Sequence, residues 1–176
     1  MILTGPPGAG KSTIARMLTE AHPAPAVHLP ADEFWRYIVT GAVAPFLPEA
    51  HPQNKVVIDI LADTAVRYAL GGYFVVLDGI IGPWFLPPFI ATARTNRVRL
   101  DYLVLRPTLP ETLRRAQARM GQALRRSAPI RSLHHQFSDL GELESHVLDT
   151  TTDSVLMTCT AVRNALRTAL GTVSAD

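Results

Sequence analysis

Residues 5–12 read Gly5-Pro6-Pro7-Gly8-Ala9-Gly10-Lys11-Ser12. They match the pattern G-x-x-x-x-G-K-[ST], known as Walker A, at every fixed position. The stretch follows a short apolar run, residues 1–4, and precedes a helical pattern over residues 11–21. This is the strand–loop–helix setting that the pattern requires. The alternative is a glycine-rich turn followed by a chance Lys-Ser pair, and the flanking elements argue against it.

The residue types of this loop suit the binding of a phosphate chain. Glycines let backbone N–H groups approach phosphate oxygens, and the helix that follows presents its positive end to the anion. Lys11 reaches the β- and γ-phosphates of a nucleotide such as ATP, as a catalytic residue, and the Ser12 hydroxyl can ligate Mg²⁺. The nucleotide-binding residues predicted here are Gly5, Pro6, Pro7, Gly8, Ala9, Gly10, Lys11, Ser12 and Thr13.

A second candidate metal ligand ends an apolar run. Residues 74–77 are Phe-Val-Val-Leu, typical of a strand buried in a parallel sheet, and Asp78 follows them directly. An aspartate at the carboxyl end of such a strand can hold a magnesium-bound water. The alternative is a turn in which Asp78 bonds the backbone beside Gly79. Next to a complete Walker A loop we favour the metal role.

Asp32 follows the second apolar run, residues 26–29, and precedes a helical pattern over residues 32–40. One interpretation is a helix N-cap, for which aspartate is among the best residues. The other is a general base that orients an acceptor hydroxyl and takes its proton. Spacing alone leaves both interpretations open.

Arginines gather in one later segment. Arg115 and Arg119 are four residues apart on a predicted helix and share a face, and Arg125 and Arg126 follow. A solvated basic face is the ordinary explanation for such a cluster. The functional hypothesis is a lid whose arginines stabilise the charge of a transferred phosphoryl group. In that hypothesis Arg119 is the catalytic arginine.

Five short apolar runs alternate with helical patterns, which predicts an α/β fold with a parallel sheet and right-handed crossovers. The predicted strands are residues 1–4, 26–29, 74–77, 100–105 and 146–149. The predicted helices are residues 11–21, 32–40, 53–70, a segment ending near 95, 110–120, 130–137 and 153–170. With 176 residues and no linker or repeat, we expect a single domain over residues 1–176.

Composition excludes several classes of protein. Apolar residues make up 47% and charged residues 18%, which is an ordinary globular composition. A net charge of +2 is too small to indicate a nucleic-acid surface. The chain shows neither a signal peptide nor an apolar run long enough to cross a bilayer. The single cysteine, Cys159, excludes an internal disulfide. We expect a cytoplasmic protein with no membrane and no nucleic-acid partner.

The chain resembles the P-loop small-molecule kinases: gluconate kinase, shikimate kinase, chloramphenicol phosphotransferase and the zeta toxin kinases. After the Walker A loop, Arg115-x-x-x-Arg119 followed by residues 136–140, Gln-Phe-Ser-Asp-Leu, is similar to the lid arginines and the S-Q-F-x-x-L-E segment of gluconate kinases. Here His135 replaces the serine, and the glutamates come later, at Glu142 and Glu144.

This resemblance implies a three-layer P-loop NTPase fold with strand order 2-3-1-4-5 and a short lid near residues 120–130. It implies that adenine packs near Arg115 and the turn over residues 149–151, which contains Thr150. It also implies that Asp32 is the base on the acceptor side, because the segment is similar to Val-Asp-Ser-Phe of chloramphenicol phosphotransferase.

Two aromatic and proline-rich segments, residues 35–54 and 82–89, are expected to line the acceptor pocket. The predicted substrate-binding residues are Asp32, Trp35, Asn54, Trp84 and Phe85. Core packing is the alternative, above all for Trp35. The segments lack clustered lysine or arginine, which argues against a highly anionic acceptor such as shikimate. A hydrophobic or nucleoside-like alcohol, for example an antibiotic, fits better.

The sequence therefore predicts an ATP- and Mg²⁺-dependent enzyme that moves the γ-phosphate to a hydroxyl of a small molecule, acting as a monomer or homodimer. A sugar-acid or nucleoside kinase is one alternative. Another is a nucleotide-dependent regulatory ATPase module that binds a protein. The base-reading motif N-K-x-D of GTPases is absent from the sequence.

Overall fold

A computed structural model of the chain describes residues 1–118 and 127–173. Within these residues the strands are β1 (Ile2–Thr4), β2 (Ala26–Pro30), β3 (Phe74–Asp78), β4 (Tyr102–Leu105) and β5 (Val147–Leu148). They form one sheet in the order β2-β3-β1-β4-β5, and every neighbouring pair is parallel. This confirms the predicted parallel sheet and strand order.

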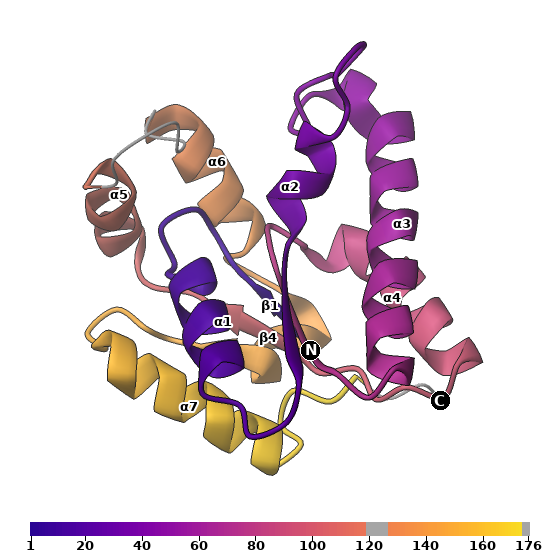
Figure 1. Ribbon diagram of the computed structural model, residues 1–176. Helices are drawn as coiled ribbons and strands as arrows, with labels where there is room; N and C mark the ends of the chain where they lie inside the picture. The colour runs from indigo at the N-terminus through magenta and orange to yellow at the C-terminus, as the bar shows by residue number, and fades with distance from the viewer. Residues whose placement is uncertain (119–126, 174–176) are drawn as a thin grey trace.

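Helices cover both faces of the sheet (Figure 1). On one face lie α1 (Lys11–Glu20) and α7 (Val155–Arg167), and on the other lie α3 (His51–Leu70) and α4 (Leu86–Thr95). The core is divided accordingly into two apolar clusters, one on each face. The result is the predicted three-layer arrangement.

The alternation of side chains along each strand sorts residues between these two clusters. On β3, Val75 and Leu77 pack toward α3 and α4, whereas Val76 packs toward α1 and α7. By the same alternation Asp78 belongs to the α1 face. The end of β3 therefore carries its carboxylate on the side of the sheet where the phosphate loop leads into α1.

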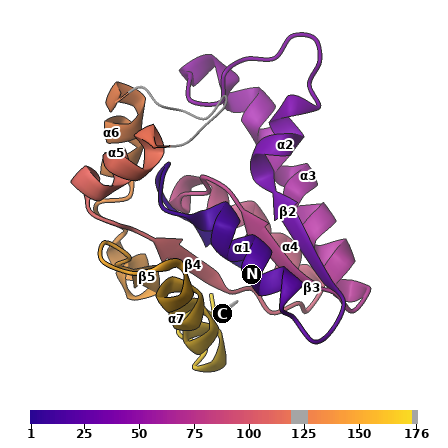
Figure 2. The ribbon, with the colours of Figure 1, turned by 60° about the vertical axis from the view of Figure 1, so that its left-hand side comes forward.

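The remaining helices gather at the carboxyl ends of the strands. They are α2 (Ala31–Arg36), α5 (Leu109–Gln117) and α6 (Ser127–Gln136). Figure 2 shows α5 and α6 side by side, across the sheet edge from α2 and α3. Single turns of 3₁₀ helix occur at Pro48–Ala50 and Pro83–Phe85, and a longer one at Gly141–His146.

Several element boundaries differ from the prediction. The helix expected over residues 32–40 ends at Arg36, because the residues that follow include the β-branched Val39, which is 92% exposed and has no core to pack against. The last helix begins at Val155, where the Ser154 side chain accepts the Met157 N–H at 3.2 Å. Strand β5 has two residues, since a 3₁₀ turn ends immediately before it.

None of the helices that the structure describes is both long and apolar enough to cross a membrane.

Candidate active site

The phosphate loop is held open by backbone conformations that require glycine. Gly5 has φ +137°, and a Cβ on it would lie 2.1 Å from the Leu105 carbonyl oxygen. Gly8 has φ +89°, and its Cβ would lie 2.6 Å from the Thr112 carbonyl oxygen. A side chain at either position would collide with backbone, so the two glycines let the loop pass closely over β4 and α5.

Lys11 lies inside this loop rather than in solvent. Its side chain is only 7% exposed, and Nζ donates hydrogen bonds to the carbonyl oxygens of Gly5 at 2.9 Å and Pro6 at 3.0 Å. The loop backbone thus surrounds a cation at the start of α1, where the positive end of the helix also points. This arrangement attracts a multiply charged anion such as a nucleotide phosphate chain.

The two predicted metal ligands meet in the structure. Ser12 Oγ donates a hydrogen bond of 2.6 Å to Asp78 Oδ2, and Asp78 is 4% exposed. A hydroxyl and a carboxylate are oxygen ligands of the kind that Mg²⁺ prefers. Among the described residues no group of three His, Cys, Asp or Glu side chains could hold a metal alone. A cation here would need phosphate oxygens and water to complete its coordination, as Mg²⁺ commonly does.

Asp78 has a second partner that the sequence analysis did not single out. His28 Nε2 lies 2.5 Å from Asp78 Oδ1, so the two carboxylate oxygens contact different side chains. The only sequence signal for His28 is a polar residue in the middle of an otherwise apolar strand. Its contact depends on the pairing of β2 with β3, which the spacing of the two segments does not reveal.

A pocket of about 460 Å³ opens beside Asp32 at the carboxyl ends of β2 and β3. The two segments expected to line it come together there, and α6 contributes the remaining wall. The lining residues are Asp32, Trp35, Arg36, Pro45, Phe46, Ile80, Trp84, Phe85, Leu133 and Gln136. Four of the five predicted substrate-binding residues are in this wall, namely Asp32, Trp35, Trp84 and Phe85.

Asn54, the fifth, does not line the pocket. It is 4% exposed, its Oδ1 accepts the Trp35 Nε1–H at 2.8 Å, and its Nδ2 donates to the Pro45 carbonyl oxygen at 2.8 Å. Its amide is therefore engaged with two residues of the wall. We correct its place from the lining of the pocket to the support behind Trp35.

Asp32 is not the N-cap of α2. The cap position is Pro30, no side chain caps the helix, and Asp32 lies in the first helical turn. In the described part of the chain its exposed carboxylate accepts no hydrogen bond. It can therefore face a ligand in the pocket.

Arg115 and Thr150, predicted to lie near adenine, are in contact. The Arg115 guanidinium donates to the Thr150 carbonyl oxygen at 2.8 Å and to Glu111 Oε1 at 2.5 Å. Hydrogen bonds from Arg114 and then from Arg115 lower the pKa of Glu111 to about 2. The Thr150 hydroxyl is buried and has no hydrogen-bond partner among the described residues. Arg119 and residues 120–126 of the expected lid lie outside those residues.

Another contact that the sequence analysis missed fastens the segment after α6. Arg106 forms a two-pronged ion pair with Glu144, 2.8 Å at each oxygen, and also donates to the Phe137 carbonyl oxygen at 2.9 Å. The hydrogen bond from Arg106, helped by the Leu140 N–H, lowers the pKa of Glu144 to about 2. The end of β4 is thereby joined to the segment that supports one wall of the pocket.

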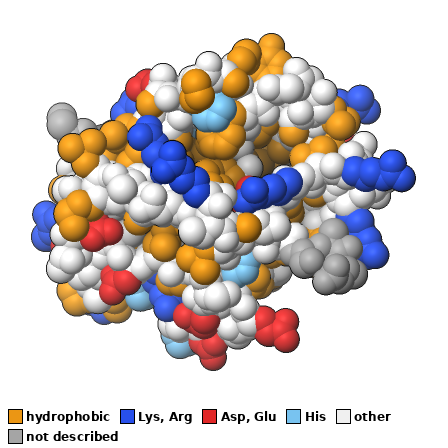
Figure 3. Space-filling view, turned by 90° about the horizontal axis from the view of Figure 1, so that it is seen from below, with side chains coloured by type: hydrophobic (Ala, Val, Ile, Leu, Met, Phe, Trp, Pro, Cys, Tyr) orange, Lys and Arg blue, Asp and Glu red, His pale blue; other side chains and the backbone are white. Residues whose placement is uncertain are grey.

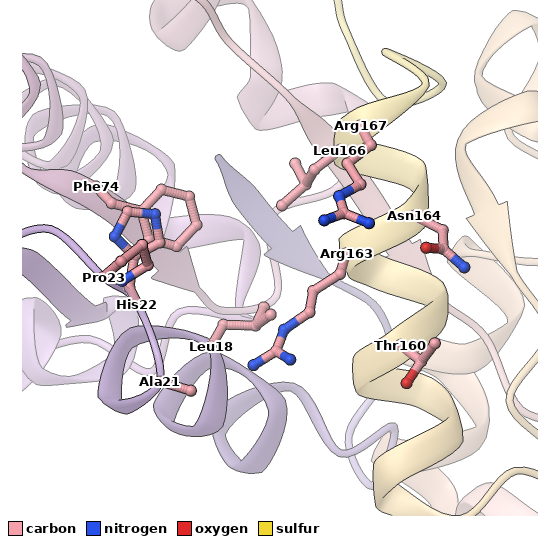
Figure 4. Close-up of a pocket in the computed structure, with 10 residues that line it drawn as sticks. All are labelled: Leu18, Ala21, His22, Pro23, Phe74, Thr160, Arg163, Asn164, Leu166 and Arg167. Atoms are coloured by element: carbon pink, nitrogen blue, oxygen red, sulfur yellow. The ribbon is translucent and has the colours of Figure 1, made fainter.

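The larger cavity of about 630 Å³ lies elsewhere, between the end of α1 and α7. Arg163 and Arg167 point into it from α7 (Figure 4), and Figure 3 shows a hollow rimmed by basic side chains. Arg167 lies in the last turn of its helix, where a cation offsets the helix dipole. The length of α1, about 15 Å, separates this cavity from the phosphate loop, so a ligand there could not meet a transferred phosphate.

The strand order and the Walker A loop are those of the P-loop NTPase fold. The chain belongs to the AAA domain family, whose model matches residues 1–142. No curated protein sequence matches it.

Solved structures show the same fold at low identity. A sugar kinase from Janibacter sp. HTCC2649 matches with a TM-score of 0.66 at 19% identity, over 98% of this chain and 97% of that one. The tunicamycin resistance protein of Deinococcus radiodurans matches with a TM-score of 0.63 at 18% identity, over 98% of each chain. A chain of the Pnkp1/Rnl/Hen1 RNA repair complex matches with a TM-score of 0.59 at 19% identity, over 77% of this chain and 42% of that one. This chain thus spans less than half of the RNA repair chain.

Proposed function

We propose that the protein transfers the γ-phosphate of ATP, with Mg²⁺, to a hydroxyl group of a small molecule. One observation carries this proposal: the pocket beside Asp32 opens at the same edge of the sheet as the phosphate loop. In open α/β sheets ligands bind at the carboxyl ends of the strands. A phosphate donor and a hydroxyl acceptor bound in these two sites would approach each other over the end of β3.

On the donor side, the loop amides and Lys11 would hold the β- and γ-phosphates. Ser12 and Asp78 would hold Mg²⁺, either directly or through water, which fits their oxygen chemistry. Bound Mg²⁺ neutralises charge on the phosphate chain. Arg115 and Thr150 would border the adenine, and Arg119 would close on the transferred group.

On the acceptor side, Asp32 would accept the proton of the attacking hydroxyl. Its carboxylate is exposed at the pocket and does not have to give up a hydrogen bond within the described structure to do so. Proton transfer to a positioned carboxylate typically contributes about 10²–10⁴ in rate.

The walls of the pocket favour an apolar or nucleoside-like alcohol. Trp35, Phe46, Trp84 and Phe85 supply aromatic surface, which suits flat or apolar ligand groups. Among the described residues that line the pocket, Arg36 is the one Lys or Arg, and it is paired with Glu33. This lining favours an acceptor that is not strongly anionic. A hydroxyl-bearing antibiotic is our preferred acceptor, and a sugar acid or a nucleoside is the alternative.

Phosphate transfer from radiolabelled ATP tests the proposal directly. The acceptor panel should contain aromatic antibiotics, nucleosides, sugars, sugar acids and a short oligonucleotide with a free 5′-hydroxyl. We expect labelled product with an apolar or nucleoside-like alcohol and none with the oligonucleotide. ATP hydrolysis that is stimulated by a protein, with no labelled small molecule, would instead favour a regulatory ATPase module. We further propose a cytoplasmic location and a monomeric or homodimeric state.

A further inference from the structure

His28 contacts the carboxylate that the proposed function assigns to Mg²⁺. Its Nε2 lies 2.5 Å from Asp78 Oδ1, while Ser12 Oγ donates to Asp78 Oδ2 at 2.6 Å. An ionised carboxylate only accepts hydrogen bonds, so the imidazole is the donor in this contact. The two oxygens of one buried carboxylate are thus divided between a residue of β2 and a residue of α1.

The sheet register explains how His28 reaches this carboxylate. His28 is paired with Val76, and Pro30 with Asp78. Val27 and Leu29 pack toward α3 and α4, so the alternation of side chains turns His28 to the opposite face, the one that carries Asp78. A histidine one position earlier or later on β2 would point away from the phosphate loop.

We propose that His28 is a positioning residue that orients Asp78 for Mg²⁺ in the nucleotide site. A carboxylate free to rotate about its bond to Cβ presents either oxygen to a metal. The hydrogen bond from His28 holds Oδ1 and leaves Oδ2 facing Ser12, where both predicted metal ligands point at one place. Asp78 is 4% exposed, so water has little access to replace the imidazole.

The ordinary alternative is that His28 only satisfies a buried carboxylate and thereby stabilises the fold. The two interpretations differ in what they affect. A purely structural role would change protein stability, and nucleotide affinity with and without Mg²⁺ would change together. A positioning role changes the Mg²⁺ requirement and leaves Mg²⁺-free nucleotide binding unchanged.

A pair of amide substitutions separates them. In His28→Gln the amide nitrogen reaches nearly as far from the backbone as Nε2, whereas in His28→Asn it reaches only as far as Nδ1. Both variants keep a polar side chain at a site that is 22% exposed, so both are expected to fold. His22→Asn is the matched control, because His22 stacks on Phe74 near the far end of α1.

The measurement is ADP affinity by calorimetry, in EDTA and across a Mg²⁺ titration, together with the unfolding temperature. We expect His28→Asn to raise the Mg²⁺ concentration needed for half-maximal enhancement of ADP binding by about 10- to 100-fold, the usual effect of losing a partner of a metal ligand. Its ADP affinity in EDTA should equal that of the wild type. His28→Gln should recover most of the Mg²⁺ response, and His22→Asn should leave it unchanged.

This inference rests on the proposed function, and the results distinguish the two. A wild-type protein that binds no nucleotide with Mg²⁺ overturns both. A wild-type protein that binds Mg²⁺-ADP while His28→Asn keeps the normal Mg²⁺ requirement overturns the positioning role alone. The positioning role is also overturned if His28→Asn lowers ADP affinity equally in EDTA and in Mg²⁺. The same holds if the Asn and Gln variants change the Mg²⁺ requirement equally.

Discussion

Backbone groups form the phosphate loop, whereas side chains from distant segments form the acceptor pocket. In the loop, Gly5 and Gly8 take positive φ values against neighbouring backbone, and Lys11 is buried among carbonyl groups. In the pocket, aromatic side chains from α2, from the 3₁₀ turn before α4 and from the loop around Pro45 meet residues of α6. A change in the loop therefore removes a geometry that every donor nucleotide needs. A change in the pocket adjusts shape and selectivity for one acceptor.

The largest expected effect follows from removing the cation of the loop. We predict that Lys11→Ala lowers phosphoryl transfer by about a thousandfold or more, because charge stabilisation at the γ-phosphate is lost. The measurement is the initial rate of transfer with the best acceptor of the panel. Lys55→Ala is the control, since Lys55 is exposed on α3 and pairs with Asp59. Equal rates for wild type and Lys11→Ala would remove Lys11 from the mechanism.

The next effect belongs to the acceptor side. Asp32→Asn should lower kcat by at least about a hundredfold, because the base is lost. ADP affinity should stay close to that of the wild type, because Asp32 lies in the other half of the site. Calorimetry with ADP and steady-state kinetics measure the two quantities, and Asp63→Asn on the exposed side of α3 serves as the control. Unchanged turnover would refute the assignment of Asp32 as base.

A smaller effect is expected behind the pocket wall. Asn54→Leu leaves the Trp35 indole N–H and the Pro45 carbonyl without their partner, which should cost about 1–3 kcal/mol of unfolding free energy. Because Trp35 then loses its fixed position, KM for the acceptor should rise while ADP affinity is retained. Denaturant unfolding and acceptor kinetics test this, with Asn96→Leu at the exposed end of α4 as the control. A rise in KM for ATP alone would contradict the support role.

The smallest effect concerns the clamp between Arg106 and Glu144 and its dependence on pH. The pKa of Glu144 is lowered from its ordinary 4.5 to about 2 by Arg106. A lowered pKa in the folded state contributes stability above the unfolded value, and this contribution disappears as pH falls from about 4.5 toward 2. Glu144→Gln should therefore be less stable than the wild type at pH 7, and the difference should shrink across that window.

Denaturant unfolding at pH 7, 5, 4 and 3 measures this change. Glu142→Gln is the control, because Glu142 is exposed and the structure gives it no ion pair within the described residues. A stability difference between Glu144→Gln and wild type that is the same at pH 7 and pH 3 would show that the charge of Glu144 does not act through Arg106.

Regions built from short-range patterns were the ones that the sequence predicted well. The Walker A loop and the apolar run ending in Asp78 follow from local spacing, whereas the order of the strands was implied by the resemblance to small-molecule kinases. The prediction of a helix reaching residue 40 was wrong at its end, because Tyr37 and Val39 beyond Arg36 are 70% and 92% exposed and add little packing to hold a further turn. Asp32 as N-cap was also excluded, since the helix begins one residue earlier and Pro30 occupies the cap.

Contacts between segments far apart in the chain were harder to predict from the sequence. Asn54 was predicted to bind the acceptor, but its amide faces Trp35 and Pro45 rather than the pocket. Neither His28 nor the pair of Arg106 with Glu144 belongs to a local sequence motif. His28 reaches Asp78 only because β2 pairs with β3. Arg106 reaches Glu144 only because the end of β4 lies beside the distant turn Gly141–His146.

By itself the sequence determined the phosphate loop, because the positive φ values at residues 5 and 8 are a local requirement that the glycines of the motif already meet. Only the tertiary structure decided that Asp78 is shared between Ser12 and His28, and that Asn54 supports Trp35. The physical reason is that hydrogen bonds of buried side chains are set by strand register and helix packing. These place groups 19 to 66 residues apart within about 3 Å of each other.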